Sequence, residues 1–216
     1  MTINIFNRDC MDAMKEMNDD AFDLAIVDPP YGIGESNGKN HSRGVRAISK
    51  KYKIKDWDNT IPPREYFDEL RRVSRFQIIW GGNYFLDYLT STPSFIVWNK
   101  INGDNDFADC EIAWTSFRTA VRMFSFRWSG MLQGDMKNKE NRIHPTQKPV
   151  RLYQWILEKY AKPNWKILDT HIGSGSIAIA CHDLGFDLTG YEIDSDYYND
   201  CMKRLNEHQR QLKLFG

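Results

Sequence analysis

Leu24-Ala25-Ile26-Val27-Asp28-Pro29-Pro30-Tyr31 joins a short apolar run to a rigid polar corner. The apolar residues are typical of a buried strand. Proline fixes φ and pushes the residue before it out of the helical region, so Asp28 and Pro29 are held extended where the strand ends. The corner then offers the Asp28 carboxylate and the Pro29 carbonyl as acceptors beside the Tyr31 ring, which suits a planar group that carries an NH2. The alternative is a strand-ending turn with a surface tyrosine.

The rest of the chain alternates apolar runs with amphipathic stretches. We interpret the apolar runs as strands, at residues 3–6, 22–28, 76–80, 94–98, 165–169 and 187–192. We interpret the amphipathic stretches as helices, at residues 12–17, 62–73, 84–89, 150–160, 177–184 and from 196 onward. Residues 111–114 and 121–128 are expected to form the two arms of an antiparallel ribbon. Strands that alternate with helices predict an α/β fold with a doubly wound, mostly parallel sheet.

Length and charge set the broad class. A chain of 216 residues suits one domain, 1–216, with a sizeable core. Basic and acidic residues number 29 each, so the net charge identifies no partner. Two segments without a carboxylate nevertheless concentrate basic residues: Lys39, Arg43, Arg46, Lys50, Lys51, Lys53 and Lys55 in the first, and Arg118, Arg122 and Arg127 in the second. Such segments indicate a polyanion site, unless they are solvated loops.

The cysteines and the N-terminal sequence indicate the cellular compartment of the protein. The four cysteines include no close pair and no zinc-like spacing with histidine, which predicts a reduced protein without a metal. The N-terminus lacks the apolar core of a signal peptide, and no stretch approaches the roughly 20 apolar residues of a spanning helix. We expect a soluble, cytoplasmic protein that does not bind membranes.

A second centre of chemistry is the segment Asp169-Thr-His-Ile-Gly-Ser-Gly-Ser176. It is predicted to be a strand, a glycine turn and the start of a helix, where the backbone can approach a ligand closely. Glu192 ends the next predicted strand, where a carboxylate can accept hydrogen bonds from ribose hydroxyls. These features predict a nucleoside cofactor. Asp169 would repel a pyrophosphate but attract an ammonium group, and this favours S-adenosylmethionine over NAD.

Together these segments resemble the DNA methyltransferases that methylate amino groups, making N6-methyladenine or N4-methylcytosine. Asn7-Arg8-Asp9-Cys10, Asp28-Pro-Pro-Tyr31, His144-Pro-Thr-Gln-Lys-Pro149 and Asp169–Ser176 with Glu192 stand in the order of the circularly permuted class, with the catalytic tetrapeptide early and the glycines late. The resemblance covers nearly the whole chain and implies a Rossmann-like fold. It departs at Thr170-His171, where the family usually has Pro-Phe, and in the short length available for sequence recognition.

The resemblance also implies roles for individual residues. Asp28, Pro29, Pro30 and Tyr31 would be catalytic. The residues implied to bind S-adenosylmethionine are Asp9, Cys10, Asp28, Thr146, Lys148, Asp169, His171, Gly173, Ser174, Gly175, Ser176, Glu192 and Ile193. DNA would contact a loop at residues 32–60 and a small recognition insert at about 101–142, through Lys39, Arg43, Arg46, Lys50, Lys51, Lys53, Arg118, Arg122 and Arg127. A homodimer is compatible with the family.

The implied reaction is methyl transfer to the N6 amino group of an adenine flipped out of DNA, because an initial Asp is commoner in adenine enzymes. The Tyr31 ring would stack on the base, so Tyr31→Phe is expected to be mild. The alternatives are N4 of cytosine, an amine of RNA or of protein glutamine, and a catalytically silent cofactor-binding subunit of a larger complex. Methylation of protein glutamine is disfavoured because it would not require the two basic segments. A silent subunit is disfavoured because it would not need an intact Asp28-Pro-Pro-Tyr31 motif.

Overall fold

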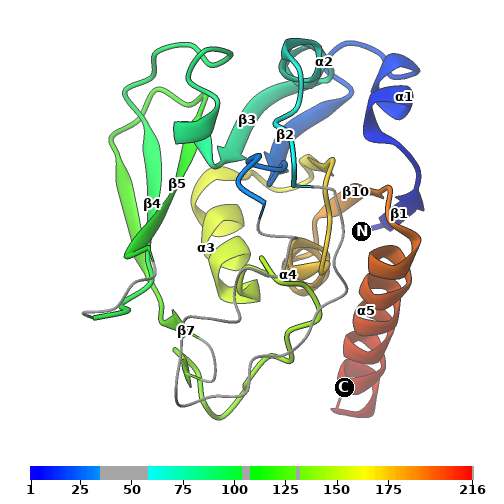
Figure 1. Ribbon diagram of the computed structural model, residues 1–216. Coiled ribbons are helices and arrows are strands. Elements are labelled where there is room, and N and C mark those ends of the chain that lie inside the picture. The colour runs from blue at the N-terminus through cyan, green and yellow to red at the C-terminus, as the bar shows by residue number, and fades with distance from the viewer. Residues whose placement is uncertain (35–57, 104–107, 130–131, 216) are drawn as a thin grey trace.

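An eight-stranded sheet runs through the computed structural model, which describes residues 1–34, 58–103, 108–129 and 132–215 (Figure 1). The sheet consists of β1 (Ile3–Asn7), β2 (Phe22–Val27), β3 (Ser74–Trp80), β4 (Phe95–Asn99), β5 (Cys110–Thr115), β6 (Arg122–Ser125), β9 (Lys166–Asp169) and β10 (Asp187–Glu192). Their order is β1-β10-β9-β2-β3-β5-β4-β6. Only β5 runs antiparallel to its neighbours. The predicted mostly parallel sheet is confirmed.

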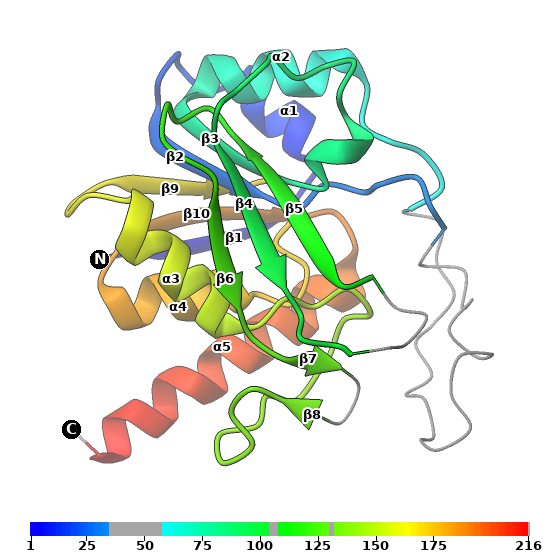
Figure 2. The same cartoon turned by 90° about the vertical axis from the view of Figure 1, so that its left-hand side faces the viewer.

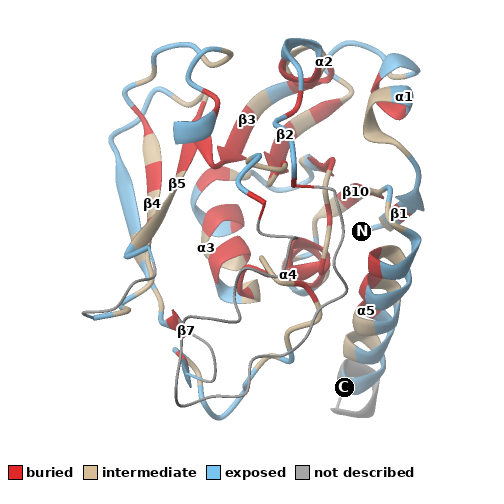
Figure 3. Ribbon diagram, viewed as in Figure 1, coloured by how far each residue is buried: buried red, intermediate tan, exposed pale blue. Residues whose placement is uncertain are grey.

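Helices cover both faces of this sheet (Figure 2). They are α1 (Cys10–Lys15), α2 (Arg64–Val73), α3 (Val150–Tyr160), α4 (Ser176–Leu184) and α5 (Ser195–Phe215). Alternate residues of a strand point to opposite faces. Accordingly, Leu24 and Ile26 of β2 pack in the core cluster with α3, α4 and α5, whereas Ala25 and Val27 pack in the cluster with α1 and α2. This two-sided burial makes the fold doubly wound, and the strand interiors are buried accordingly (Figure 3).

The centre of the sheet contains the point where the strand order reverses. β9 and β2 are parallel neighbours, paired at Ile167 with Leu24 and at Leu168 with Ala25. From β9 the chain passes through α4 to β10 on one side, and from β2 it passes through α2 to β3 on the other. In open α/β sheets, ligands bind beyond the carboxyl ends of strands at such a switch point. Asp169 ends β9 and Asp28 follows β2, so both predicted centres of chemistry meet there.

Two expectations about local structure were wrong. Residues 111–114 and 121–128 do not form a ribbon, because β4 lies between β5 and β6 and pairs antiparallel with β5 and parallel with β6. Residues 84–89 do not form a helix. Only a short 3-10 helix, Gly82–Tyr84, is present there, and Leu86 is exposed, so the segment has no continuous apolar stripe.

The segment expected to be a recognition insert, residues 101–142, is largely part of the fold. It supplies β5 and β6 to the main sheet, and a separate hairpin of β7 (Trp128–Ser129) and β8 (Leu132–Gln133). Most of the loop at 32–60, with Lys39, Arg43, Arg46, Lys50, Lys51 and Lys53, lies outside the described residues. Within the described part of the chain, no helix combines the length and the apolar character needed to cross a membrane.

Candidate active site

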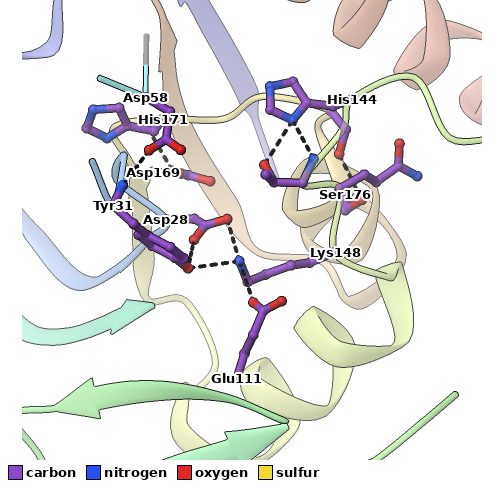
Figure 4. Close-up of polar contacts among 12 residues, drawn as sticks. Asp28, Tyr31, Asp58, Glu111, His144, Lys148, Asp169, His171 and Ser176 are labelled. Carbon is purple, nitrogen blue, oxygen red and sulfur yellow. Dashed lines mark hydrogen bonds and ion pairs between the residues drawn. The ribbon is translucent and has the colours of Figure 1, made fainter. Parts of the chain in front are cut away.

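The Asp28 carboxylate is held from two sides at the end of β2 (Figure 4). The Tyr31 hydroxyl donates to Asp28 Oδ1 at 2.5 Å, and Lys148 Nζ donates to Asp28 Oδ2 at 2.5 Å. Lys148 Nζ also lies 3.3 Å from the Tyr31 hydroxyl. Pro29 is buried and Pro30 half-buried, and both peptide bonds are trans. The predicted corner is therefore a fixed hydrogen-bond acceptor, and Tyr31 is not a surface tyrosine, because its hydroxyl donates to Asp28.

The Tyr31 ring is packed against the end of β3. It stacks on Tyr84 with ring centroids 4.9 Å apart. Gly81 follows β3 with φ of +70°, and a Cβ at Gly81 would lie 2.2 Å from Tyr31 Cε1. The absence of a side chain at Gly81 allows the Tyr31 ring to approach the backbone closely. Any side chain at this position would displace the ring.

Asp58 fixes the turn that follows the tetrapeptide. Its side chain is 2% exposed, and Asp58 Oδ1 accepts from the backbone N–H of Tyr31 at 2.8 Å and of Gly32 at 2.9 Å. This role of Asp58 was not predicted, because Asp58 lies 27 residues beyond Tyr31, after a segment whose sequence shows no periodicity. A single Asp in such a segment carries no local signal for this role.

Lys148 bridges Asp28 to a second carboxylate, Glu111 of β5, which the sequence analysis also missed. Its ammonium is 3.1 Å from Glu111 Oε2, and the Lys148 side chain is 3% exposed. Lys100 Nζ lies 2.5 Å from the other oxygen of Glu111. Two carboxylates and two ammonium groups thus form one charge-balanced cluster at the Asp28–Tyr31 corner. The structure places Lys148 at this corner, and its predicted contact with the cofactor stays a prediction.

The cluster shifts the ionisation of its members. Burial, reinforced by the nearby Glu111, raises the pKa of Asp28 despite Lys148. Lys148 and Lys100 outweigh burial at Glu111 and lower its pKa to about 2. The two carboxylates raise the pKa of Lys148 despite its burial. Glu111 is therefore the ionised partner of Lys148 at neutral pH, and of the two carboxyls Asp28 takes up a proton more readily.

The predicted glycine turn between β9 and α4 is present, and its glycines have a left-handed backbone. Gly173 has φ of +49° and Gly175 has φ of +71°. A Cβ on Gly175 would lie 2.5 Å from Cys201 Sγ, so α5 packs directly against the turn. From α5, Arg204 Nη1 donates to the Ser174 carbonyl at 2.8 Å. The turn is thus held in place by contacts with α5.

Other groups hold the serines of this turn. Ser174 and Ser176 are buried, with their hydroxyl oxygens 3.2 Å apart. Ser176 Oγ accepts from Arg204, whose second nitrogen pairs with Glu140 at 2.6 Å. The hydroxyls of both serines therefore have protein partners, and their predicted contact with a cofactor stays a prediction.

Two carboxylates stand at neighbouring strand ends beside the turn. Asp169 is 2% exposed, and burial, with Asp28 and Glu192 nearby, raises its pKa to about 8. Glu192 ends β10 and accepts from the backbone N–H of Gly173 and of Asp194, each at 3.0 Å. The adjacent Ile193 side chain is 64% exposed. One buried acid and one half-buried acid thus lie at the strand ends where the Asp28–Tyr31 corner is also found.

The remaining predicted cofactor residues surround this edge. Burial lowers the pKa of His171 to about 4, so its ring is neutral, and it packs edge-on to Tyr66 with centroids 5.4 Å apart. Asp9 caps α1 by accepting from the Met11 N–H at 2.7 Å. Burial raises the pKa of the neighbouring Cys10 to about 12, which keeps the thiol neutral.

His144 covers the glycine turn from the His144–Pro149 segment. Its ring is 3.8 Å from the position that a Cβ of Gly173 would take, and it packs on Tyr197 with centroids 4.2 Å apart. Thr146 Oγ1 lies 3.1 Å from His144 Nδ1. The sequence analysis assigned Thr146 to the site but not His144, although both belong to the same quoted motif.

The predicted DNA-binding arginines of the second segment do not form one patch. All three are exposed. Arg127 lies beyond the carboxyl end of β6 and donates to the Ile101 carbonyl at 3.3 Å. Arg122 begins β6, and Arg118 follows the end of the antiparallel β5. Both therefore lie at the ends of the strands opposite to the end where Asp28 is found. Of the three, only Arg127 is on the same side of the sheet as Asp28.

The residues at this edge fit S-adenosylmethionine. Asp169 supplies a buried carboxylate for an ammonium group, and Glu192 supplies one for ribose hydroxyls. The backbone of Gly173 is not crowded, since the nearest atoms to the position of a Cβ there belong to His144, at ordinary van der Waals distance. Exposed Ile193 offers an apolar surface next to Glu192. Acceptors, apolar surface and open backbone match an amino acid joined to a nucleoside.

Comparison with known proteins supports this assignment. The N6_N4_Mtase family, described as DNA methylase, matches residues 74–203, more than half of the chain. The chain is 25% identical to the protein YubD of Escherichia coli K12, over 95% of this chain and 91% of that protein. It is 24% identical to the type II methyltransferase M.HinfI of Haemophilus influenzae, over 94% of this chain and 68% of that protein. The M1.HpyAVI–SAM complex matches with a TM-score of 0.60 at 21% identity, covering 94% of this chain and all of that one.

Proposed function

Because this chain belongs to the N6-adenine and N4-cytosine family of DNA methylases, which use S-adenosylmethionine, we propose that it methylates the N6 amino group of adenine in DNA. The observation that carries the proposal is the Asp28 carboxylate, fixed by Tyr31 and Lys148 at the switch point beside Asp169. An initial Asp in the tetrapeptide favours adenine over cytosine. The permuted order of motifs is part of the same proposal.

The catalytic corner would act on the lone pair of the amino nitrogen. That lone pair is delocalised into the base, so the nitrogen is a weak nucleophile. Hydrogen bonds from its two N–H groups to the Asp28 carboxylate and the Pro29 carbonyl would favour a pyramidal nitrogen. A carboxylate has about four acceptor sites. Asp28 uses one for Tyr31 and one for Lys148, so it retains capacity for the substrate.

Bound S-adenosylmethionine supplies a methyl group on a positively charged sulfur. The amino nitrogen that accepts this methyl group would lose one proton. The raised pKa of Asp28 makes this carboxylate suited to receive that proton and to stabilise positive charge before it leaves. Alignment of the two substrates can contribute roughly 7–11 kcal/mol when the site is preorganised. Asp169 and Glu192 would hold the cofactor for this alignment.

The base must leave the duplex to reach Asp28, at a cost of a few kcal/mol. Stacking on an aromatic ring offsets roughly 1–3 kcal/mol of such a cost. Tyr84 already stacks on one face of the Tyr31 ring, and its own side chain is 42% exposed. We propose that the pair Tyr31–Tyr84 forms the aromatic platform. Arg127 and the basic residues of 32–60 would contact phosphates, and binding should weaken steeply with salt.

Transfer of labelled methyl from S-adenosylmethionine to unmethylated DNA, followed by nucleoside analysis, tests the proposal. We expect N6-methyladenine. N4-methylcytosine as the product would move the assignment to the other branch of the family. Label found in RNA and not in DNA would overturn the substrate. Cofactor binding without transfer to either nucleic acid would support a silent subunit of a larger complex.

Tyr31→Phe should lower kcat by roughly 10–100-fold, because a hydrogen bond to a charged group is worth about 1.5–3 kcal/mol. The structure thus changes the expectation of a mild effect, since the Tyr31 hydroxyl bonds to Asp28. Tyr84→Phe is the matched control, since it removes a hydroxyl from the ring stacked on Tyr31. Steady-state methyl transfer measures both variants, and equal rates for them would contradict the role of the Tyr31 hydroxyl.

Affinity for S-adenosylmethionine should rise with pH between about 6 and 7.5, by up to roughly tenfold per pH unit. Burial raises the pKa of Asp169 to about 8, so below that pH the carboxyl of the free protein is protonated. The cofactor ammonium favours the charged form, and binding must therefore release a proton. Calorimetric titrations across this range give Kd. The slope should vanish in Asp169→Asn, and a flat profile in the unmodified protein would contradict the assignment.

A further inference from the structure

A cluster of two histidines and an aspartate joins α4 to α5, away from the residues assigned to catalysis. Asp183 Oδ1 lies 2.6 Å from His208 Nε2 and 3.6 Å from His182 Nδ1. All three ligand atoms lie within 4.8 Å of one another. The side chains of His182, Asp183 and His208 are 19%, 23% and 26% exposed. From this geometry we propose a binding site for a divalent transition-metal ion, with Zn²⁺ as its best-suited occupant.

The geometry of the cluster is close to that of a zinc site. Zn²⁺ is held by imidazole nitrogens and carboxylate oxygens at about 2.0–2.2 Å, in a tetrahedron whose corners are about 3.4 Å apart. The separation of His182 Nδ1 from Asp183 Oδ1 already matches this spacing. The shorter contact of His208 would lengthen by less than one ångström. Three protein ligands would leave the fourth position to water.

A bound ion would give a partner to His182 Nδ1, which the ion pair of Asp183 with His208 leaves without one in the part of the chain that the structure describes. A proton on His208 Nε2 satisfies Asp183, whereas His182 Nδ1 is buried and has no hydrogen-bond partner among the described residues. A cation bound between the three groups would satisfy both nitrogens and the oxygen at once. Its binding would displace the proton from His208 Nε2. Mg²⁺ and Ca²⁺ prefer sites made of oxygen ligands, so they fit this cluster less well.

A further contact orients the carboxylate. Gln154 of α3 donates from Nε2 to Asp183 Oδ2 at 3.0 Å, which turns Oδ1 toward the two imidazoles. Outer partners of this kind fix the orientation of metal ligands, and their loss typically costs 10–100-fold in affinity. The cluster therefore has ligands and a supporting group contributed by α3, α4 and α5, which lie together on one side of the sheet (Figure 2).

A bound ion would fasten α5 at a second point. Arg204, one helical turn before His208, holds the start of α4 through Ser176. His208 lies beside the end of the same helix. Zn²⁺ at the cluster would thus hold the end of α4 against α5, while Arg204 holds the start of α4 against the same helix. We expect a higher Tm when the ion is bound, because it binds the folded chain and not the separated helices.

The test uses the full chain without an affinity tag, stripped with EDTA and titrated with Zn²⁺ alone. One equivalent should bind, and Co²⁺ in its place should give the intense visible absorption of a four-coordinate site. His182→Gln should abolish this binding without touching the pair of Asp183 with His208. Gln154→Leu should weaken it by roughly 10–100-fold. Asp200→Asn, which removes an exposed carboxylate from α5, is the matched control and should bind normally.

Two results would overturn the proposal. The first is the absence of saturable Zn²⁺ binding by the unmodified chain. The second is unchanged affinity in both His182→Gln and Asp183→Asn, which would place any bound zinc elsewhere, for example on a cysteine. Circular dichroism in EDTA establishes that each variant is folded before its affinity is compared.

Discussion

Asp28→Ala should lower kcat for methyl transfer by at least about 10³-fold. The variant loses the acceptor that would orient the amino nitrogen and the charge that would stabilise the transition state, and removal of a single preorganised group of this kind commonly costs about 10²–10³. Single-turnover transfer of labelled methyl measures the loss. S-adenosylmethionine should still bind, because Asp169 and Glu192, which would hold it, are on β9 and β10 and are not changed by the substitution.

The design of that experiment must separate chemistry from folding. Asp28→Ala leaves Lys148 paired with Glu111, so the buried ammonium keeps one partner. Asp28→Asn keeps the volume of the side chain and an acceptor for Lys148, and it should be nearly as inactive, because it lacks the charge. Near-normal transfer by Asp28→Asn would show that the carboxylate charge is not used. Near-normal transfer by Asp28→Ala would remove Asp28 from the mechanism altogether.

Lys148→Met should destabilise the protein by about 3–5 kcal/mol, since breaking a buried ion pair leaves its partners uncompensated. The change leaves the carboxylates of Asp28 and Glu111 facing each other across an apolar side chain. Urea unfolding at pH 7 measures the free energy of unfolding. The loss should be smaller at pH 5, because the raised pKa of Asp28 rises further without Lys148 and the carboxyl then takes up a proton.

Two further variants show whether charge is the cause. Adding Glu111→Gln to Lys148→Met removes the second carboxylate and should restore part of the lost stability, as a double-mutant cycle would reveal. Lys100→Met removes the outer ammonium, whose side chain is 18% exposed and pairs with Glu111, and should cost less than Lys148→Met. Equal losses in the two lysine variants would contradict the central place of Lys148.

Local patterns were sufficient where one segment decides its own structure. The amphipathic stretch at 62–73 contains α2, which buries Tyr66, Phe67, Leu70 and Val73. The helix at 150–160 and the strand at 187–192 have the expected bounds. The left-handed turn at Gly173 and Gly175 follows from their lack of a side chain. These features depend on periodicity and on φ, both of which a sequence displays directly.

Pairing between distant segments could not be predicted in this way. Alternation in residues 111–114 and 121–128 indicates two strands but does not identify their neighbours, and β4 occupies the place between them. Arg118 and Arg122 are close in sequence to Arg127 but lie at the opposite ends of the strands, because the length of β6 separates them from Arg127. Strand order results from the packing of whole helices on both faces, and no short segment encodes it.

The sequence by itself determined the α/β class, the corner Asp28–Tyr31 and the glycine turn with its acid Glu192, because each depends on the chemistry of adjacent residues. Only the tertiary structure decided which groups surround the Asp28 carboxylate. Lys148 lies 120 residues away from Asp28 in the chain, and Glu111 comes from β5, which is antiparallel to its neighbours in the main sheet. Burial of these charges has a free-energy cost that only their mutual pairing offsets, and that pairing exists only when β2, β5 and the segment before α3 converge.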